Sequence, residues 1–322
     1  MEKLLQKYFN KFERLRIDKA HGEPAPHKPI LLISVLQAFQ KNLITGNQVY
    51  ISPELVALFK TNWGLLVTSK HDCRFALPFY HLKSDGFWTL VAKSGFENLL
   101  QLASSMRSFA NLNAAIEFAV IDDDLLLLMK DQNSNSILIQ FLLDHYFPNH
   151  KNNLTDSSHQ QQKYFDDIEG MILHDSPEQY SNEIKRLMVE KNDEEIFIRG
   201  SLFKREVPKI YNYTCCISGM KIDATINVSM VDACHIVPFS ESYNDTISNG
   251  IALCPNLHRA FDRGLIAIDD DYKVIVSSNF REINSDYSIQ KFEGKVILLP
   301  KVKEYYPLKK NLGWHREKVF KN

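Results

Sequence analysis

Three side chains in the C-terminal third of the sequence are of types that take part in hydrolysis. They are His235, Asn249 and His258, offset by 14 residues (235 to 249) and 9 residues (249 to 258). Histidine titrates near neutrality, so a neutral imidazole can take a proton from water that attacks a phosphodiester. Each residue also has an ordinary explanation: a buried or zinc-binding histidine, a turn at Asn249-Gly250, and a surface position on a helix. The surrounding elements decide between these explanations.

The elements predicted around these residues are two short strands and a helix. The run VDACHIV (231–237) reads as a strand leading into His235, and GIALC (250–254) reads as a second strand. PNLHRAFDRG reads as a helix that starts at Pro255 and is capped by Gly264. A hairpin is expected to follow around residues 269–271. On this layout the joint placement of the three side chains favours one catalytic site over three unrelated structural roles.

The segment ACHIVPFSESYNDTISNGIALCPNLHRAFDRGLIAID resembles the HNH endonucleases of restriction-type proteins. CISG (216–219) before it, and WHRE (314–317) with VF (319–320) after it, resemble the flanking motifs of the same subfamily. The resemblance covers about residues 206–320. It implies a ββα-metal domain that hydrolyses the DNA backbone with a divalent metal.

The resemblance also implies a role for each side chain. Phosphodiester hydrolysis needs an activated water and a cation that stabilises charge on the phosphate and the leaving oxygen. His235 is expected to be the general base, and His258 is expected to hold the cation, Mg²⁺ or Mn²⁺. Asn249 either ligates the metal or braces the loop that carries the base, since the family uses this position in both ways.

One departure from the family lies at Cys234, where many relatives have a metal-binding Asp or His. A thiolate is a poor partner for Mg²⁺. Asp232, the nearest carboxylate, is therefore the expected second ligand, with Asp262 on the helix as its rival. Structural zinc is not expected, because the cysteines of this region include no Cys-x-x-Cys pair.

Two motifs in the N-terminal half, PAPHKPILL (24–32) and LPFYHLKSDGFWTL (77–90), resemble the DNA sulfur-binding domain. That domain recognises phosphorothioate-modified DNA and is often fused to HNH nucleases in type IV restriction enzymes. The resemblance covers about residues 1–150. Helices are predicted from Pro29 onwards, over 53–63, 96–108 and 136–146, and a strand pair around the Ser-Asp-Gly turn at 84–86.

A phosphorothioate replaces a strongly hydrated oxygen with a larger, softer sulfur, so its reader is expected to place an apolar wall beside hydrogen-bond donors. The candidates for the wall are Pro78, Phe79 and Tyr80. The candidates for donors are His27, Lys28, Arg74 and His81. Relatives often have an aromatic residue before the proline, where this sequence has Leu77. Core packing is the alternative for the aromatic candidates.

The composition is that of a globular protein, with 44% hydrophobic and 24% charged residues in 322. A net charge of −1 argues against non-specific coating of nucleic acid. Five cysteines without a disulfide pattern, and no apolar run of membrane-spanning length, predict a cytoplasmic protein that does not enter membranes. Residues 301–322 are rich in Lys, Arg and aromatics, and either contact phosphates or form a solvated helix.

We therefore predict an α+β protein with three parts: a mixed α/β recognition domain (1–150), a polar linker and helical connector (151–195), and an HNH domain (196–322). The predicted function is a restriction endonuclease that recognises phosphorothioate-modified double-stranded DNA and cuts nearby. A homodimer is expected, since one HNH site cuts one strand. Two alternatives remain: recognition of another modification, such as a methylated or hydroxymethylated base, and a binder whose nuclease site is degenerate.

Overall fold

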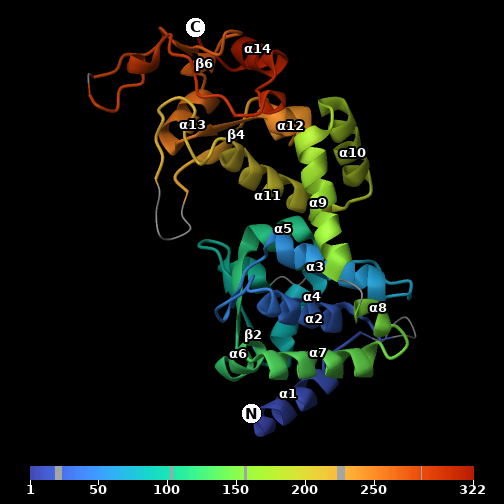
Figure 1. The fold of residues 1–322 in the computed structure, drawn as a ribbon. Helices are drawn as coiled ribbons and strands as arrows, with labels where there is room; N and C mark the ends of the chain where they lie inside the picture. The colour runs from blue at the N-terminus through green and yellow to red at the C-terminus, as the bar shows by residue number, and fades with distance from the viewer. Residues whose placement is uncertain (19–23, 102–103, 156–157, 223–228, 284) are drawn as a thin grey trace. The chain divides into compact units, whose positions relative to one another are not determined.

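A computed structural model describes residues 1–18, 24–101, 104–155, 158–222, 229–283 and 285–322 (Figure 1). The chain divides into two compact units, residues 1–166 and 167–322. The division falls inside the segment 151–195 that the sequence assigned to a linker and connector. Among the described residues, no helix combines the length and apolar character needed to cross a membrane. The architecture is α+β, as predicted.

The first unit surrounds a buried helix, α2 (His27–Gln40), whose residues 28–39 are all buried. A three-stranded antiparallel sheet in the order β1-β3-β2 lies in the same unit, with β1 at Gln48–Val49, β2 at Trp88–Ala92 and β3 at Ile116–Ile121. The other helices are α1 (Glu2–Glu13), α3 (Pro53–Leu66), α4 (Ala76–His81), α5 (Phe109–Ala115), α6 (Asp123–Lys130), α7 (Gln132–Tyr146) and α8 (Asn152–Thr155).

Local signals predicted some of these elements and misread others. The α3 helix starts as expected, with Pro53 in its first turn and the Ser52 side chain accepting a hydrogen bond from Leu55 N at 3.2 Å. The strand predicted before the Ser-Asp-Gly turn is wrong, because residues 76–81 form α4. Phe75 and Phe79 are spaced for a helix, and their ring centroids lie 5.5 Å apart.

The helix predicted over residues 96–108 is also wrong. Two short 3₁₀ segments, Glu97–Gln101 and Ser105–Arg107, lie there instead, and residues 102–103 fall outside the described ones. Ser104, Ser105 and Ser108 interrupt the apolar spacing, since serine side chains compete for backbone hydrogen bonds.

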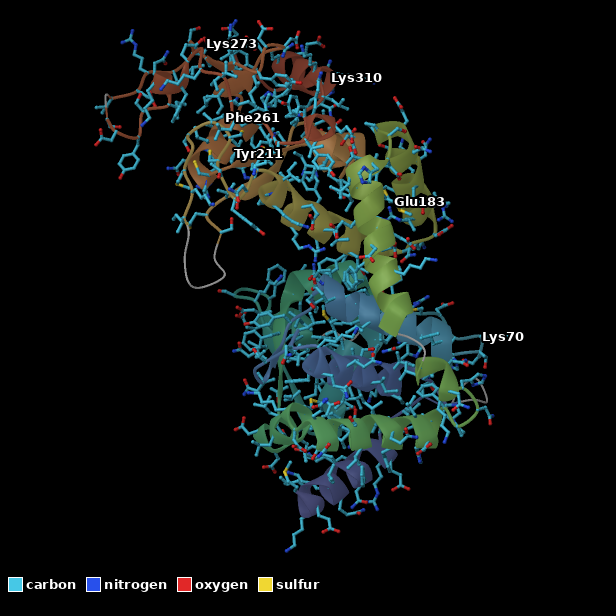
Figure 2. All side chains as sticks on the ribbon, viewed as in Figure 1. Lys70, Glu183, Tyr211, Phe261, Lys273 and Lys310 are labelled. Carbon is cyan, nitrogen blue, oxygen red and sulfur yellow. The ribbon has the colours of Figure 1, made fainter. Side chains whose placement is uncertain are left out.

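Three long helices lead into the small sheets of the second unit, and the first of these helices begins before the division at residue 166. The helices α9 (Ser158–His174), α10 (Pro177–Val189) and α11 (Asp193–Ile210) occupy most of the predicted linker and connector. Two antiparallel pairs follow: β4 (Asp232–His235) with β5 (Gly250–Leu253), and β6 (Ile266–Ile268) with β7 (Val274–Val276). The remaining α-helices are α12 (Phe239–Ser242), α13 (Pro255–Asp262) and α14 (Lys309–Lys318). In Figure 2, Tyr211 and Phe261 lie in the interior of this unit, and Lys273 and Lys310 at its surface.

Two glycines hold the β4-β5-α13 motif against its neighbours. Gly250 pairs with His235, and a Cβ at Gly250 would lie 2.5 Å from a methyl group of Val207 on α11. Gly264 follows α13 with φ of 71°, the left-handed conformation predicted for the cap, and a Cβ there would collide with the Val319 carbonyl. Both positions therefore exclude larger side chains.

Candidate functional site

The β4 strand carries candidate residues on both of its faces. Successive strand side chains point to opposite faces, so Asp232 and Cys234 share one face and His235 lies on the other. Asp232 contacts His258 of α13, and His235 packs on Phe203 of α11. The predicted metal-binding histidine therefore contacts a side chain on one face of the strand, and the predicted base lies on the other face.

The His235 imidazole is held by one hydrogen bond and one stacking contact. Its Nε2 lies 2.7 Å from Oδ1 of Asp245, and its ring stacks on Phe203 with centroids 4.0 Å apart and planes 14° apart. A carboxylate only accepts, so Nε2 carries the hydrogen and Nδ1 is the basic nitrogen of the neutral ring. Within the described residues Nδ1 has no hydrogen-bond partner. The nitrogen available to take a proton is thus Nδ1.

The buried Asn249 amide uses all of its hydrogen-bonding capacity in the loop between β4 and β5. Its Oδ1 accepts from Val237 N and from Asn311 Nδ2, both at 3.0 Å. Its Nδ2 donates to the carbonyls of Val237 at 2.9 Å and Asn244 at 3.0 Å. An amide offers two donors and two acceptor positions. Of the two roles expected for Asn249, these contacts match the bracing role, and metal ligation would require one of them to break.

The His258 imidazole lies between two carboxylates. Its Nδ1 is 3.3 Å from Asp232 Oδ2, and its Nε2 is 3.4 Å from Asp262 Oδ2, one turn further along α13. Donor atoms of Cys234, His258 and Asp262 all lie within 4.8 Å of one another. Carboxylate oxygens suit Mg²⁺ or Mn²⁺, so His258 together with a neighbouring carboxylate could hold the divalent metal of the predicted site.

The two carboxylates beside His258 cannot have the same role. A neutral imidazole binds a cation through one nitrogen and donates its hydrogen through the other, usually to a carboxylate. One of Asp232 and Asp262 would therefore share the cation, and the other would accept the N–H. Burial and the nearby Asp262 carboxylate raise the pKa of the Cys234 thiol well above its ordinary value. The protonated thiol is a poor ligand for a hard cation.

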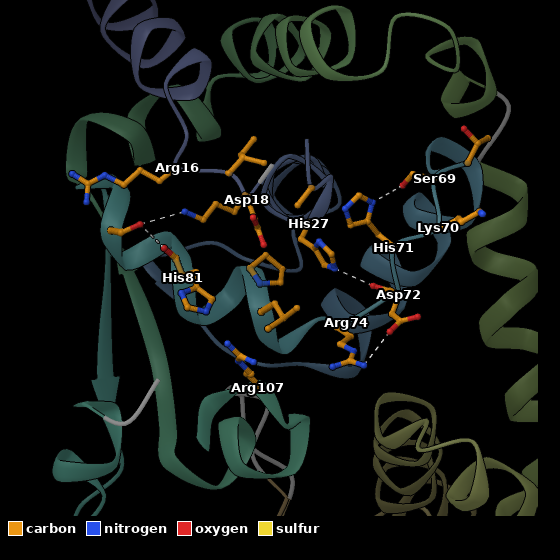
Figure 3. A pocket seen from close by; sticks show the side chains of 17 residues that line it. Arg16, Asp18, His27, Ser69, Lys70, His71, Asp72, Arg74, His81 and Arg107 are labelled. Carbon is orange, nitrogen blue, oxygen red and sulfur yellow. Dashed lines mark hydrogen bonds and ion pairs between the residues drawn. The ribbon is translucent and has the colours of Figure 1, made fainter. Parts of the chain in front are cut away.

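A cavity of about 1360 Å³ lies in the first unit (Figure 3). Its lining includes five of the residues predicted to contact DNA: His27, Lys28, Arg74, Pro78 and His81. It also includes residues that the sequence interpretation did not single out as contacts, among them Arg16, Ile17, Lys70, His71, Leu77 and Arg107. The cavity therefore combines apolar and cationic side chains from several segments of the chain.

His27 enters this cavity as a neutral group. Its Nε2 lies 2.9 Å from the Asp72 carbonyl oxygen, and burial lowers the pKa of the imidazole to about 4. Arg74, paired with the Asp72 carboxylate at 3.0 Å, remains more than half exposed (Figure 3). Of these two predicted donors, Arg74 supplies the positive charge and His27 does not.

One residue of the cavity lining, Lys28, forms a buried ion pair. Lys28 Nζ lies 2.6 Å from Asp85 Oδ2, with side chains 8% and 3% exposed. Asp85 also accepts a hydrogen bond from Arg16 N at 2.9 Å, so it links α2 to the chain that follows α1. Because its charge is compensated inside the protein, Lys28 is positioned to shape the cavity as well as to line it.

Comparison with known families finds a match within each unit. Residues 5–157 match the family described as "ScoMcrA-like, DNA sulfur-binding domain", and residues 215–269 match the family described as "HNH endonuclease". The chain carries both domains. The recognition made from the sequence is confirmed, and HNH nucleases as a class are metal-dependent and act on DNA. No curated protein matches the chain.

One solved structure in the comparison is described as "Modification dependent TagI restriction endonuclease". It aligns at 23% identity and a TM-score of 0.27, over 36% of this chain. The aligned part spans 37% of that protein's length.

In the DNA sulfur-binding domain, the two aromatic candidates lie away from the cavity. Phe79 and Tyr80 are 0% and 2% exposed, and neither lines it. Phe79 packs edge-to-face on Trp88 at 5.2 Å, and the Tyr80 hydroxyl donates to the Leu100 carbonyl at 2.6 Å. The helical conformation of α4 turns these rings into the core and leaves Pro78 at the cavity. The apolar lining therefore comes from Ile17, Ala25, Leu77 and Pro78.

In the HNH domain, part of the basic C-terminal segment is structural. The buried His315 ring stacks on Phe261 with centroids 3.6 Å apart, and its Nε2 donates to the Phe261 carbonyl at 3.0 Å. Arg316 donates to the Ile268 carbonyl and to the Asp270 carboxylate, both at 2.8 Å. These contacts fasten α14 to α13 and to the β6–β7 hairpin. Lys309 and Lys310 stay exposed.

The residue that the sequence interpretation missed in the HNH domain is Asp245. It lies in the irregular loop SYNDTISN, ten positions after His235, where no regular spacing links the two. The only sequence signal for Asp245 was its position as a carboxylate between the candidate base, His235, and the bracing Asn249.

Proposed function

We propose that this protein is a modification-dependent endonuclease that recognises phosphorothioate-modified DNA and hydrolyses the backbone nearby. The observation that carries the proposal is the cavity of the DNA sulfur-binding domain, in a chain that also carries an HNH site. Leu77 and Pro78 form an apolar wall beside the guanidinium groups that line it. An apolar wall suits sulfur, and guanidinium groups suit the remaining phosphate oxygens.

The charges around the cavity favour a phosphate backbone. Five lining residues are Lys or Arg, and two are Asp. Within the described residues, neither Lys70 nor Arg107 forms an ion pair. Cations without a partner in the protein are free to neutralise phosphates and release counterions.

In the proposed hydrolysis, Nδ1 of His235 takes a proton from water as the water oxygen bonds to phosphorus and the bond to the leaving ester oxygen breaks. Asn249 holds the loop after the base, which keeps His235 at the end of β4. His258, with Asp262 or Asp232, would hold the divalent metal. Bound there, Mg²⁺ or Mn²⁺ would supply positive charge to the phosphate and the leaving oxygen.

A cleavage assay tests the proposal. Plain, phosphorothioated and methylated duplexes of one sequence are incubated with the full chain in Mg²⁺, in Mn²⁺ and in EDTA. We expect metal-dependent cutting of the phosphorothioate duplex only. Equal cutting of plain DNA would rule out sulfur recognition, cutting of the methylated duplex would indicate another modification, and shifted but intact DNA would indicate a binder.

The same assay on His235→Ala tests the base. We expect cutting to fall by about 1000-fold or more, because general-base catalysis contributes about 10² to 10⁴. Binding to the phosphorothioate duplex, measured by gel shift, should persist. A variant that still cuts would show that another group takes the proton.

We also propose that the protein cuts both strands as a homodimer, because one HNH site cuts one strand. The ratio of nicked to linear product from a modified plasmid, followed against protein concentration, tests this proposal.

A further inference from the structure

The carboxylate that holds His235 is itself held by helices outside the matched HNH residues. Asp245 is 2% exposed, and its Oδ2 lies 3.5 Å from the Tyr180 hydroxyl of α10. A Cβ added at Gly200 of α11 would lie 3.8 Å from the same oxygen. Since α10 and α11 end before residue 215, where the HNH match begins, the surroundings of the base extend upstream of that match.

Further contacts tie the same helices to the loop of Asp245. Ser181 of α10 donates to the Ser242 carbonyl at 2.8 Å. On the other side, Asn249 donates to the Asn244 carbonyl at 3.0 Å, and Thr246 N donates to Asn244 Oδ1 at 2.8 Å. The residues on either side of Asp245 are thus fixed by short hydrogen bonds. A carboxylate held in this way keeps its position when its partner changes charge.

We infer that Asp245 is the positioning residue of the general base. We also infer that α10 and α11 contribute to the nuclease site, because Tyr180 holds Asp245 and Phe203 stacks on His235. The inference rests on the proposed function, in which His235 takes the proton. Asp245 fixes the Nε2–H tautomer, so that Nδ1 is the basic nitrogen, and it stabilises the imidazolium that forms when Nδ1 is protonated. Phe203 keeps the ring in plane by stacking.

The groups around Asp245 suit this role. Burial and the Asp245 charge raise the pKa of Tyr180 well above its ordinary value, so its hydroxyl stays protonated and donates to the carboxylate. The Arg199 guanidinium lies over the Tyr180 ring, 5.6 Å from its centroid, and its Nε is 3.5 Å from Glu195. Buried charges need such partners to remain charged. Contacts between side chains therefore connect Arg199 and Tyr180 of the two helices to Asp245 and, through it, to the base.

The tautomer is measured directly by a long-range ¹⁵N–¹H spectrum of histidine-labelled full-length protein near neutral pH, with His235 assigned from the His235→Gln variant. We expect a protonated Nε2 and an unprotonated Nδ1 in the wild type. Asp245→Asn should give a mixture of tautomers, because an amide either donates or accepts toward Nε2. A wild-type ring protonated at Nδ1 would overturn the inference.

Cleavage kinetics provide the second readout. Asp245→Asn should lower kcat by about 100-fold or more, with little change in KM, because it acts on the base and not on DNA binding. Tyr180→Phe should lower kcat by about 3- to 10-fold, and Phe203→Leu by about 10-fold, and neither is expected to unfold the chain. Asp271→Asn, an exposed aspartate in the β6–β7 turn, is the matched control and should cut at the wild-type rate.

The outcomes separate this inference from the proposed function. If the wild type cuts DNA and Asp245→Asn cuts it equally fast, the positioning role is wrong and the proposed nuclease activity is unaffected. A wild type that cuts no DNA, yet shows the expected tautomer and its loss in Asp245→Asn, would refute the nuclease and support the positioning contact. If Asp245→Asn fails to fold, wild-type kinetics in both Tyr180→Phe and Phe203→Leu would overturn the role of the helices.

Discussion

The two candidate sites of this protein are assembled in opposite ways. In the HNH domain, the candidate ligands and the base come from β4 and α13, which lie within residues 232–262. In the sulfur-binding domain, the cavity is lined from well-separated stretches, at 16–18, 25–28, 68–84 and 107. The first site depends on the spacing within a motif, whereas the second depends on tertiary packing. Sequence interpretation was accordingly more informative for the first site.

The two sites also differ in how their charges are compensated. In the HNH domain each candidate imidazole faces a carboxylate within 3.4 Å. At the cavity, Lys28 is paired and buried, whereas Lys70 and Arg107 form no ion pair within the described residues. The nuclease site therefore has an excess of carboxylates, which suits a bound cation, whereas the cavity leaves positive charge for a ligand. Substitutions at the two sites should affect different measurements.

The largest effect is expected at the buried pair that anchors the cavity. Asp85→Asn would leave the Lys28 ammonium buried without a countercharge, and should lower the free energy of unfolding of the N-terminal unit by about 3 kcal/mol. Urea unfolding followed by tryptophan fluorescence measures this loss. A Trp314→Phe background confines the signal to Trp63 and Trp88 of this unit.

The matched control for that pair is exposed. Lys7 and Asp124 lie 2.6 Å apart with side chains 42% and 46% exposed, so Asp124→Asn should cost less than about 1 kcal/mol. Equal losses in the two variants would mean that the buried pair does not anchor the cavity.

An intermediate effect is expected at the two carboxylates beside His258. Asp262 lies one turn from His258 on a rigid helix and belongs to the cluster with Cys234, so Asp262→Asn should raise the Mn²⁺ concentration for half-maximal cutting by about 100-fold. Asp232→Asn should raise it by about 10-fold, as expected for an acceptor of the other N–H. This ranking reverses the sequence prediction, in which Asp232 came first.

Direct titration of Mn²⁺ into the protein without DNA, followed by electron paramagnetic resonance, measures the same two variants independently of cutting. A larger loss of Mn²⁺ affinity for Asp232→Asn would restore the original ranking. Equal binding by both variants and the wild type would place the metal elsewhere.

The smallest effect is expected at the cationic lining of the cavity. Arg107→Ala and Arg74→Ala should each weaken binding to a phosphorothioate duplex by about 10-fold. Each should also reduce the slope of the logarithm of the binding constant against the logarithm of salt concentration by about one. The cutting rate at saturating DNA should not change, because neither residue belongs to the HNH domain. Lys3→Ala, on the exposed side of α1, is the control and should bind as the wild type does. A change in the saturated rate would contradict the separation of the two sites.

The parts of the fold that follow local rules were predictable, and those that depend on distant partners were not. The α13 helix has its own start and stop signals in Pro255 and Gly264, so His258 could be placed on it correctly. The short run before Gly86 offered aromatic residues consistent with either a strand or a helix, and packing around Phe79 selected the helix.

Long-range contacts explain what the site prediction lacked. The Tyr180 hydroxyl reaches Asp245 across 65 residues of chain, and no spacing rule relates the two. Arg107 lies within the segment 96–108 that was predicted as one continuous helix, so its place at the cavity was hidden. The choice between bracing and metal ligation for Asn249 likewise depends on its hydrogen bonds to the Val237 backbone, which are visible only in the folded chain.

The offset between Asp232 and His235 is an odd number of residues, and this parity has a consequence for insertions and deletions. Along a strand, an odd offset places two side chains on opposite faces, and an even offset places them on the same face. Adding or removing one residue within β4 would turn either the base away from Phe203 or the carboxylate away from His258. A substitution at Ala233, which lies between them, keeps the parity. The length of this four-residue strand is therefore more tightly constrained than the identity of the residue at position 233.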